Sequence, residues 1–298
     1  MYDNLEYIGR EIKRIRKSQN LSQKKLAELA GLSEESLRRI ENNYNNPRLD
    51  NLTDIFRVLG INFDIILMRE EGSYWEEVDE KIKVIDFELS NTNYDNILKY
   101  TDELVELKSS LPQKYRLRLS QYILYYQAVY DNEVIYDELA CKEKLIRALE
   151  INNCKLENNN FNDIEIRILT KLSEYYINNE DDDDIPRQIL DTLIRTVDKR
   201  NTHYINILYN KARFFYMIGD YKSTVAVSLE AIKISSEINN YNRLIILYYI
   251  IGISKYKLGE DDYIDYIEKS KMLCDLMLKD KLKETIETSV YNITKAKR

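Results

Sequence analysis

The chain has 298 residues but only 7 glycines and 3 prolines, which argues against a barrel, a sandwich or a doubly wound sheet, because the turns of such folds need both residues. Hydrophobic residues make up 44% of the chain, enough to bury a core and to exclude wholesale disorder, and the length suggests about two domains. The net charge of −7 argues against nucleic acid as a partner, but residues 1–70 hold 12 basic and 11 acidic residues, whereas residues 71–298 hold 32 and 40. The composition therefore predicts an all-α protein with its acidity in the second part.

The first seventy residues predict four short helices. Apolar residues at helical spacing outline an amphipathic helix over residues 4–18. A second helix begins after Ser22 and a third covers residues 34–42, each preceded by a serine that can accept hydrogen bonds from free amides at a helix start. Gly31 lies between these two helices, where a left-handed backbone turns the chain sharply. A fourth helix is expected over residues 49–59.

The segment "IRKSQNLSQKKLAELAGLSEESLRRIENN" resembles the helix-turn-helix of the phage-repressor and Cro type, the XRE family. The resemblance places the third helix in the major groove of double-stranded DNA, with Arg39 donating to guanine and Glu35 accepting from cytosine. It also gives Arg16 and Glu41 the positions of an internal salt bridge. An alternative for Glu34 and Glu35 is that they only stabilise the N-terminus of their helix. The residues assigned to DNA are Gln23, Lys24, Glu34, Glu35, Ser36, Arg38, Arg39 and Arg48, of which Lys24 and Arg48 hold phosphates.

From about residue 74 onward, helix pairs recur with a period near 40 residues, which is typical of an α-solenoid. Residues 206–234 resemble a tetratricopeptide repeat, with Gly219 in the turn between its two helices, and Gly252 and Gly259 belong to the next repeat. The expected domains are a DNA-binding domain, residues 1–70, and a repeat domain, residues 71–298. The expected helices are 74–90 with 94–109, 115–130 with 136–151, 162–178 with 186–199, 203–218 with 221–237, 242–258 with 261–278, and a capping helix 280–296.

Solenoids of this kind bind extended peptides on the face formed by the first helix of each pair. Asn206 and Arg213 are the strongest candidates, because polar groups are rarely placed for packing, and an arginine here can hold a peptide carboxylate through two hydrogen bonds. The alternative for each aromatic candidate is packing between repeats. The groove-facing positions that the tetratricopeptide resemblance implies are Asn206, Tyr209, Arg213, Tyr216, Tyr249 and Tyr256, and the candidates in the preceding repeats are Tyr176 and Gln127, with Gln121 as a further one.

Nothing in the sequence supports an enzyme, a metal site or a cofactor. No P-loop, dinucleotide-binding glycine pattern, HExxH or paired CxxC occurs, and His203 is the only histidine. The acidic run 180–184 lacks the alternating ligands and central glycine of a calcium loop. Three cysteines without paired spacing fit a reducing compartment. The N-terminus carries no apolar signal segment, and the longest apolar run, residues 244–253, is too short to span a bilayer, so a soluble intracellular protein without membrane partners is expected.

Both parts together resemble the RRNPP group of bacterial regulators, which includes the Rap, Rgg, NprR, PlcR and PrgX families. The resemblance implies a cytoplasmic quorum-sensing transcription factor that binds a pseudo-palindromic operator as a homodimer and a short signalling peptide in its repeats. Peptide binding is then expected to change the curvature or order of the repeats, and so to alter DNA binding. Two alternatives are a protein-interaction scaffold, and a phage or plasmid repressor whose repeats only dimerise. Whether the peptide promotes or releases DNA binding stays open.

Overall fold

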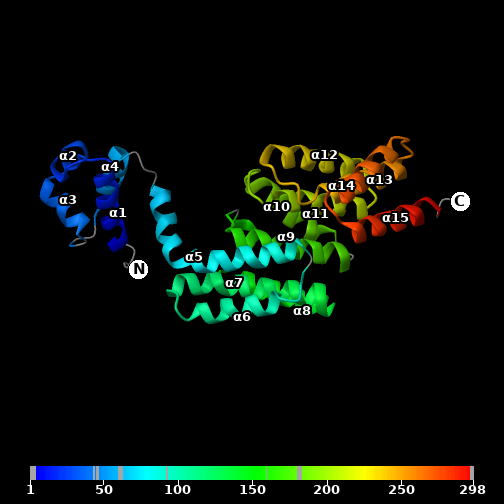
Figure 1. Ribbon diagram of the computed structural model, residues 1–298, viewed down its shortest axis with the longest axis horizontal. Coiled ribbons are helices and arrows are strands. Elements are labelled where there is room, and N and C mark those ends of the chain that lie inside the picture. The colour runs from blue at the N-terminus through cyan, green and yellow to red at the C-terminus, as the bar shows by residue number, and fades with distance from the viewer. Residues whose placement is uncertain are drawn as a thin grey trace. The chain divides into compact units, whose positions relative to one another are not determined.

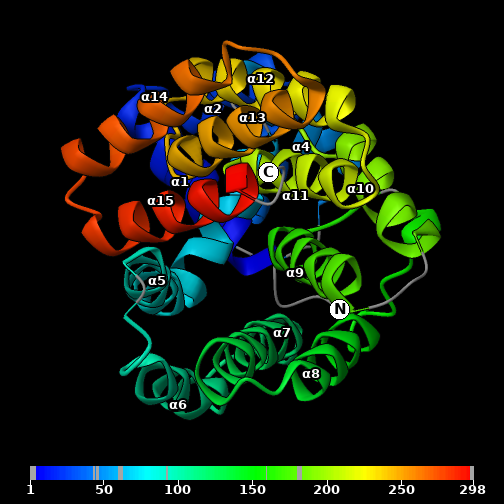
Figure 2. The ribbon, with the colours of Figure 1, turned by 90° about the vertical axis from the view of Figure 1, so that its right-hand side faces the viewer.

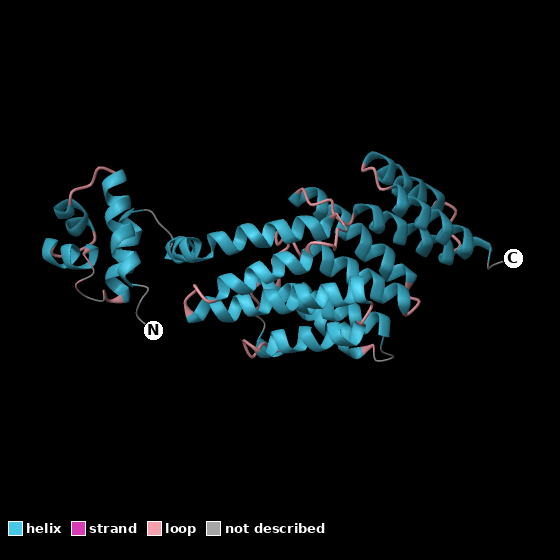
Figure 3. Cartoon of the chain, turned by 60° about the horizontal axis from the view of Figure 1, so that its bottom comes forward, coloured by secondary structure: helices cyan, strands magenta, loops and turns pink. Residues whose placement is uncertain are grey.

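The computed structural model describes residues 5–42, 44, 47–59, 63–91, 93–158, 160–179 and 183–295. Within these ranges the chain is helical and contains no strand (Figure 3), so the prediction of an all-α protein is confirmed. The contacts divide the chain into two compact units, residues 1–84 and residues 85–298. Residues 180–182 of the acidic run lie outside the described ranges. No helix in the part described is long and apolar enough to cross a membrane.

The N-terminal unit begins with four helices built as the sequence predicts (Figure 1): α1 Leu5–Ser18, α2 Gln23–Leu29, α3 Glu34–Glu41 and α4 Leu49–Leu59. Ser22 accepts a hydrogen bond from the Lys25 amide, and Ser33 accepts one from the Ser36 amide, so serines cap both α2 and α3. Gly31 has φ +67° and turns the chain between them. All four helices contribute to one apolar core, whose most buried members are Ile12, Leu26, Leu37 and Ile55.

A buried ion pair ties α1 to α3. Arg16 Nε lies 2.6 Å from Glu41 Oε1, Arg16 Nη2 lies 3.0 Å from Glu41 Oε2, and the Glu41 side chain is fully buried. Arg16 Nη1 also donates to the Leu21 carbonyl at 2.7 Å. The predicted structural role of this pair is confirmed, because the guanidinium and carboxylate groups neutralise each other inside the bundle. Neither group lies on the outer face of α3.

The next helix, α5, covers Phe63–Ser90 and so begins eleven residues earlier than the predicted start at residue 74. No proline interrupts residues 63–73, and the single Gly72 costs a helix only about 1 kcal/mol relative to alanine. The helix therefore continues through the expected domain boundary at residue 70. The two compact units divide inside it, after Val84.

The second unit is a series of antiparallel helices that follow one another around an arc, from α6 to α15 (Figure 2). The predicted helices are present at close to their expected bounds. A π-helical turn, Asp131–Ile135, was not predicted, and it joins the end of α7 to α8. The bounds are α6 Ile97–Lys108, α7 Gln113–Tyr130, α8 Glu138–Glu150, α9 Asp163–Asn179, α10 Asp184–Thr196, α11 Tyr204–Met217, α12 Tyr221–Ile238, α13 Leu244–Leu258, α14 Tyr263–Leu276 and α15 Asp280–Lys295.

Hydrogen bonds between residues about 40 apart connect the first helix of each pair to the first helix of the next. Tyr126 Oη on α7 donates to Asp86 Oδ1 on α5 at 2.9 Å. Asn210 Nδ2 on α11 donates to the Thr170 carbonyl on α9 at 2.9 Å. The Tyr249 and Ser289 hydroxyls, on α13 and α15, lie 2.6 Å apart. This recurrence marks α5, α7, α9, α11 and α13 as the equivalent helices of successive pairs, as the period in the sequence predicts, and the expected capping helix α15 takes the next position in the series.

The glycines of the two clearest repeats occupy the positions that the sequence assigns to them. Gly219 and Gly259 have φ of +79° and +78° and end α11 and α13. A Cβ atom on Gly252 would lie 2.6 Å from Ile267 Cδ1, so α13 and α14 pack too closely for a side chain there. Three positions of the repeat are therefore fixed by backbone geometry and close packing.

Leu278, in the turn between α14 and α15, has φ +54° and is 85% exposed. We expect Leu278→Gly to raise the free energy of unfolding by about 0.5–1 kcal/mol, because glycine removes the left-handed strain and few contacts are lost. The measurement is urea unfolding of the full chain followed by circular dichroism. The matched control is Leu276→Gly, where the same change at the exposed end of α14 removes a good helix former and destabilises. Equal effects of both variants would contradict the expected strain.

Candidate functional site

The outer face of α3 presents charged side chains to solvent. Glu34, Glu35, Arg38 and Arg39 are exposed, whereas Leu37 and Ile40 face the core. Lys24 on α2 and Arg48 before α4 are also exposed, and Ser36 is half-buried with its hydroxyl 2.7 Å from that of Ser33. The predicted DNA-contacting side chains of α3 therefore lie on the solvent side of the helix, and the core residues hold it in place.

Glu35 forms ion pairs with both arginines of α3. Arg38 donates two hydrogen bonds to the Glu35 carboxylate, from Nε and from Nη2, each at 2.8 Å. Arg39 Nε lies 3.7 Å from Glu35 Oε1. The hydrogen bond from Arg38 and the charges of both arginines lower the pKa of Glu35. Arg39 is therefore the less tightly held of the two guanidinium groups and the one with more freedom to contact a base.

Gln23, at the start of α2, is half-buried, and its Nε2 donates to Glu41 Oε2 at 2.7 Å. The buried pair of Arg16 and Glu41 thus also fixes the amide group of Gln23, whose Oε1 and second N–H are left for a ligand. One buried carboxylate consequently holds the start of α2 against the end of α3.

The second unit contains a cavity of about 190 Å³, which we call the polar cavity. Its wall combines side chains of α5, α7, the π-helical turn, α9 and α11 with residues before α6, α11 and α13. Most of its side chains are polar, and several are charged, which suits a ligand that forms hydrogen bonds and ion pairs rather than an apolar one. Its charged and amide side chains include Glu133, Arg167, Lys171, Glu174, Asn206 and Arg243.

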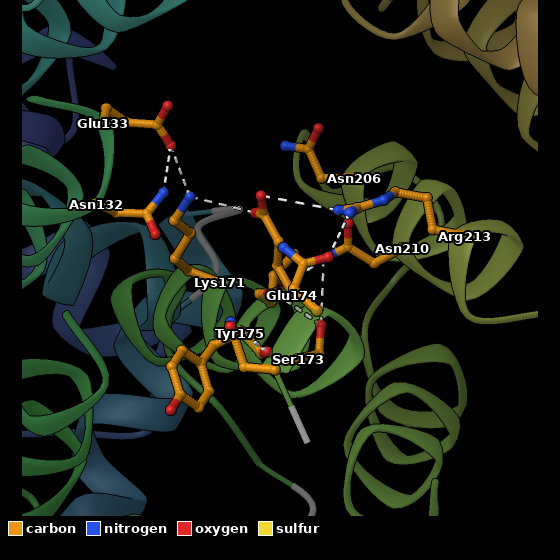
Figure 4. Close-up of polar contacts among 12 residues, drawn as sticks. Asn132, Glu133, Lys171, Ser173, Glu174, Tyr175, Asn206, Asn210 and Arg213 are labelled. Carbon is orange, nitrogen blue, oxygen red and sulfur yellow. Dashed lines mark hydrogen bonds and ion pairs between the residues drawn. The ribbon is translucent and has the colours of Figure 1, made fainter. Parts of the chain in front are cut away.

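A line of ion pairs crosses the wall from the π-helical turn to α11 (Figure 4). Lys171 Nζ lies 2.9 Å from Glu133 Oε1 and 3.4 Å from Glu174 Oε2, and Arg213 Nη1 lies 3.8 Å from Glu174 Oε1. Burial opposes the charge of Lys171, but the Glu174 and Glu133 carboxylates outweigh it and raise the pKa of Lys171. Burial likewise opposes ionisation of Glu133, and Lys171 outweighs it and lowers the pKa of that carboxyl. Both groups are therefore charged at neutral pH.

Arg167 connects the polar cavity to α5. Its Nη1 lies 2.7 Å from Asp86 Oδ1, and its Nε lies 3.0 Å from Asp163 Oδ2. His203 Nε2 lies 3.2 Å from the other oxygen of Asp163. Burial opposes ionisation of Asp163, but His203 and Arg167 hold the pKa of Asp163 well below its usual range. The last turns of α5 are therefore attached to α9 through a guanidinium group that also lines the cavity.

The structure brings some of the predicted peptide-binding residues together and separates the others. Asn206 lines the polar cavity. The centre of the Tyr209 ring lies 5.8 Å from the guanidinium carbon of Arg213 and 5.1 Å from that of Arg243, and Arg243 is itself part of the cavity wall. Arg213 donates to Asn178 Oδ1 at 2.7 Å in addition to its contact with Glu174, so its guanidinium group is already engaged.

The remaining candidates lie away from the cavity wall. Tyr176 packs against the core of α9–α12, and Tyr216 forms an edge contact with Tyr221. Tyr249 contacts Ser289, and Tyr256 Oη donates to the Thr294 carbonyl at 3.3 Å, so both face α15. Gln121 is buried and donates to the Ala148 carbonyl at 3.0 Å. Gln127 is half-buried on α7 and is not part of the wall.

Sequence reasoning missed most of the charged wall. Arg167, Lys171 and Glu174 recur at intervals of four and three residues on α9, so they form one charged stripe beside the apolar residues that this helix buries. That stripe is a signal that could have identified them. Arg243 gives no such signal, because it precedes α13 instead of lying within a periodic pattern.

Comparisons with known proteins agree with both units. Residues 12–66 match the helix-turn-helix family model. The immunity repressor protein of Bacillus phage phi105 is 38% identical over 79 residues, which cover 25% of this chain and 55% of the repressor. The chain thus matches only about half the length of this curated relative.

Solved structures match over nearly the whole chain. Bacillus thuringiensis PlcR in complex with the peptide PapR7 and DNA has a TM-score of 0.71 at 23% identity, with 94% of this chain and 99% of that one covered. ComR from S. thermophilus, in complex with DNA and its signalling peptide ComS, has a TM-score of 0.59 at 16% identity, with 96% and 99% covered. The Streptococcus dysgalactiae SHP pheromone receptor Rgg2 has a TM-score of 0.59 at 13% identity, with 96% of this chain and 99% of that one covered. The chain therefore carries an XRE-type helix-turn-helix domain at its N-terminus and shares the fold of the RRNPP-type regulators PlcR, ComR and Rgg2.

Proposed function

We propose that this protein is a cytoplasmic transcription regulator that binds double-stranded DNA through α3 and is controlled by a short signalling peptide in its second unit. The observation that carries the proposal is the polar cavity, with charged and amide side chains on the equivalent helices of successive repeats. The structural neighbours PlcR and ComR, each in complex with DNA and a peptide, support it.

The DNA-binding part rests on the exposed face of α3 and on the family match of residues 12–66. Arg39 reads a guanine, and Lys24 and Arg48 hold phosphates on either side. A single domain of this size makes few base contacts, so we infer that the protein binds a pseudo-palindromic operator as a homodimer with one domain per half-site. The acidity of the remaining chain does not oppose this, because residues 1–70 carry a slight excess of basic residues.

The peptide-binding part rests on hydrogen-bonding groups and aromatic rings in and around the polar cavity. An extended peptide exposes unpaired backbone amides and carbonyls, and side chains such as Asn206 can bond to both. Tyr209 and its neighbouring arginines supply a surface for side chains of the peptide. Binding across several helices at once stabilises one arrangement of the repeats, which is how a ligand in the second unit can alter DNA binding.

The test is calorimetric titration of the full chain with short linear peptides selected on it from a random library, together with peptides covering any small open reading frame beside the gene. We expect binding at micromolar affinity or better. Asn206→Ala should weaken it about tenfold, because a hydrogen-bonding group inside the cavity is lost, while operator binding without peptide is unchanged. The matched control is Gln188→Ala, which removes an exposed amide on α10, outside the cavity wall. If no peptide binds, the repeats serve a protein partner or dimerisation instead.

A further inference from the structure

Arg243 differs from the other cations around the polar cavity. Arg167 has Asp86 and Asp163 within 4 Å, Lys171 has Glu133 and Glu174, and Arg213 reaches Glu174. For Arg243, which is half-buried in the wall, no carboxylate of the described residues lies within that distance. It is thus a charged group removed in part from water without an opposite charge, which is an unfavourable arrangement unless a ligand supplies one.

Two contacts fix the orientation of the Arg243 side chain. Its Nε donates to Asn206 Oδ1 at 2.8 Å, and its guanidinium carbon lies 5.1 Å from the centre of the Tyr209 ring. Because Nε is used, the two terminal nitrogens Nη1 and Nη2 are left without an acceptor among the described residues. The Asn206 amide nitrogen likewise has no acceptor among the described residues, because it is the Asn206 oxygen that bonds to Arg243. Both groups belong to the cavity wall.

The paired nitrogens of a guanidinium group match the two oxygens of a carboxylate, and such charge-assisted pairs are stronger than neutral hydrogen bonds. An adjacent amide donor adds a further hydrogen bond to the same anion. The nearby Glu133 and Glu174 are each paired with Lys171, which reduces the repulsion that they exert on an arriving anion. Arg213, the arginine that the repeat pattern favours, has its nitrogens on Asn178 and Glu174 instead.

We infer that Arg243, with Asn206 and Tyr209 behind it, is the specificity-determining residue of the peptide site and selects peptides that present a carboxylate. The carboxylate comes from an Asp or Glu side chain or from the free C-terminus of the peptide. This inference rests on the proposed function, since it names the chemical class of the ligand that the polar cavity binds.

The test is a double-mutant cycle on the full chain with a library-selected peptide. In one arm each acidic side chain of the peptide is changed to its amide, and in the other the C-terminus is amidated. On the wild type, the arm that removes the recognised carboxylate weakens binding about 10–100-fold, a range typical of a charged hydrogen-bonded contact in a site. On Arg243→Met, which keeps the length and apolar character of the stem, the same peptide change has almost no further effect. Arg243→Lys keeps the positive charge but not the paired nitrogens of the guanidinium group, so on this variant the same peptide change weakens binding by an intermediate factor.

The control variant is Arg200→Met, which removes an arginine whose side chain is 87% exposed in the turn before α11 and outside the cavity wall, and which leaves the peptide affinities unchanged. If the wild type binds peptides but neither arm weakens binding, or if the loss is equally large on Arg243→Met, the carboxylate inference is overturned and the proposed function stands. If the wild type binds no peptide at all, both fail. Circular dichroism and thermal unfolding of Arg243→Met confirm that a lost response is not lost folding.

Discussion

Glu41→Ala should unfold the N-terminal unit or leave it only marginally stable. The substitution leaves the Arg16 guanidinium group buried beside an apolar methyl group, and it also removes the acceptor of the Gln23 amide. Breaking one side of a buried pair costs about 3–5 kcal/mol, which is a large part of the total stability of a small domain. The measurement is hydrogen exchange of the full chain by mass spectrometry, in which the amides of α1 to α4 lose protection while those of α7 to α14 keep it.

The surface pair of Lys25 and Glu28 supplies the matched control, because both side chains are more than half exposed. Glu28→Ala should change exchange little, since exposed ion pairs contribute about 0–1 kcal/mol. The double variant Arg16→Met/Glu41→Leu removes both charges together and should recover much of the lost protection. Wild-type exchange in Glu41→Ala would show that the buried pair is not what holds α1 to α3.

Arg39→Ala should abolish specific operator binding while leaving the fold intact. A bidentate contact between arginine and guanine contributes about 1–3 kcal/mol of discrimination, so a dimer that loses two such contacts loses about 30-fold or more in operator affinity. Arg39 is exposed and contributes no core contact, so the unit itself stays folded. The measurement is fluorescence anisotropy at fixed salt, with an operator selected on the wild type from random double-stranded DNA.

Arg57→Ala is the matched control, because Arg57 is an exposed arginine on α4 that pairs with Asp54. It should change operator affinity little. An unchanged affinity in Arg39→Ala would remove α3 from its assigned role. An equal fall on the operator and on unrelated DNA would instead place Arg39 on a phosphate, because phosphate contacts strengthen binding to all sequences alike.

The sequence predicts the fold well where local chemistry decides the structure. Ser22 and Ser33 mark helix starts, Gly219 and Gly259 mark helix ends, and each of these signals depends only on nearby backbone. The predicted start of α5 at residue 74 was wrong, although the sequence offers a signal near residue 63, since Asn62 is a residue type that favours helix starts and no proline interrupts residues 63–73. The π-helical turn at Asp131–Ile135, by contrast, has no local signature. Such features depend on how neighbouring helices pack, which no short segment records.

The candidate site follows the same division. The exposed residues of α3 could be predicted from a motif confined to a few turns of helix, and the structure places them on the solvent side. The cavity wall could not, because its charged groups come from residues 133, 167–174, 206 and 243, brought together by stacking of repeats. The sequence singles out Arg213 as a ligand for a carboxylate. In the structure Arg213 is occupied by Glu174 and Asn178, which lie one repeat earlier, so the arginine without a carboxylate partner among the described residues of the cavity is Arg243 instead.

The attachment of α5 to its neighbours has a mechanical consequence. The helix is held near its C-terminal end, where Asp86 Oδ1 accepts hydrogen bonds from both Tyr126 and Arg167, and Arg167 lines the polar cavity. One oxygen atom therefore joins α5 to α7 and to α9. A shift of the Arg167 guanidinium group toward a ligand would move or break a contact that Tyr126 shares, so the last turns of α5 cannot stay in place while the cavity wall rearranges.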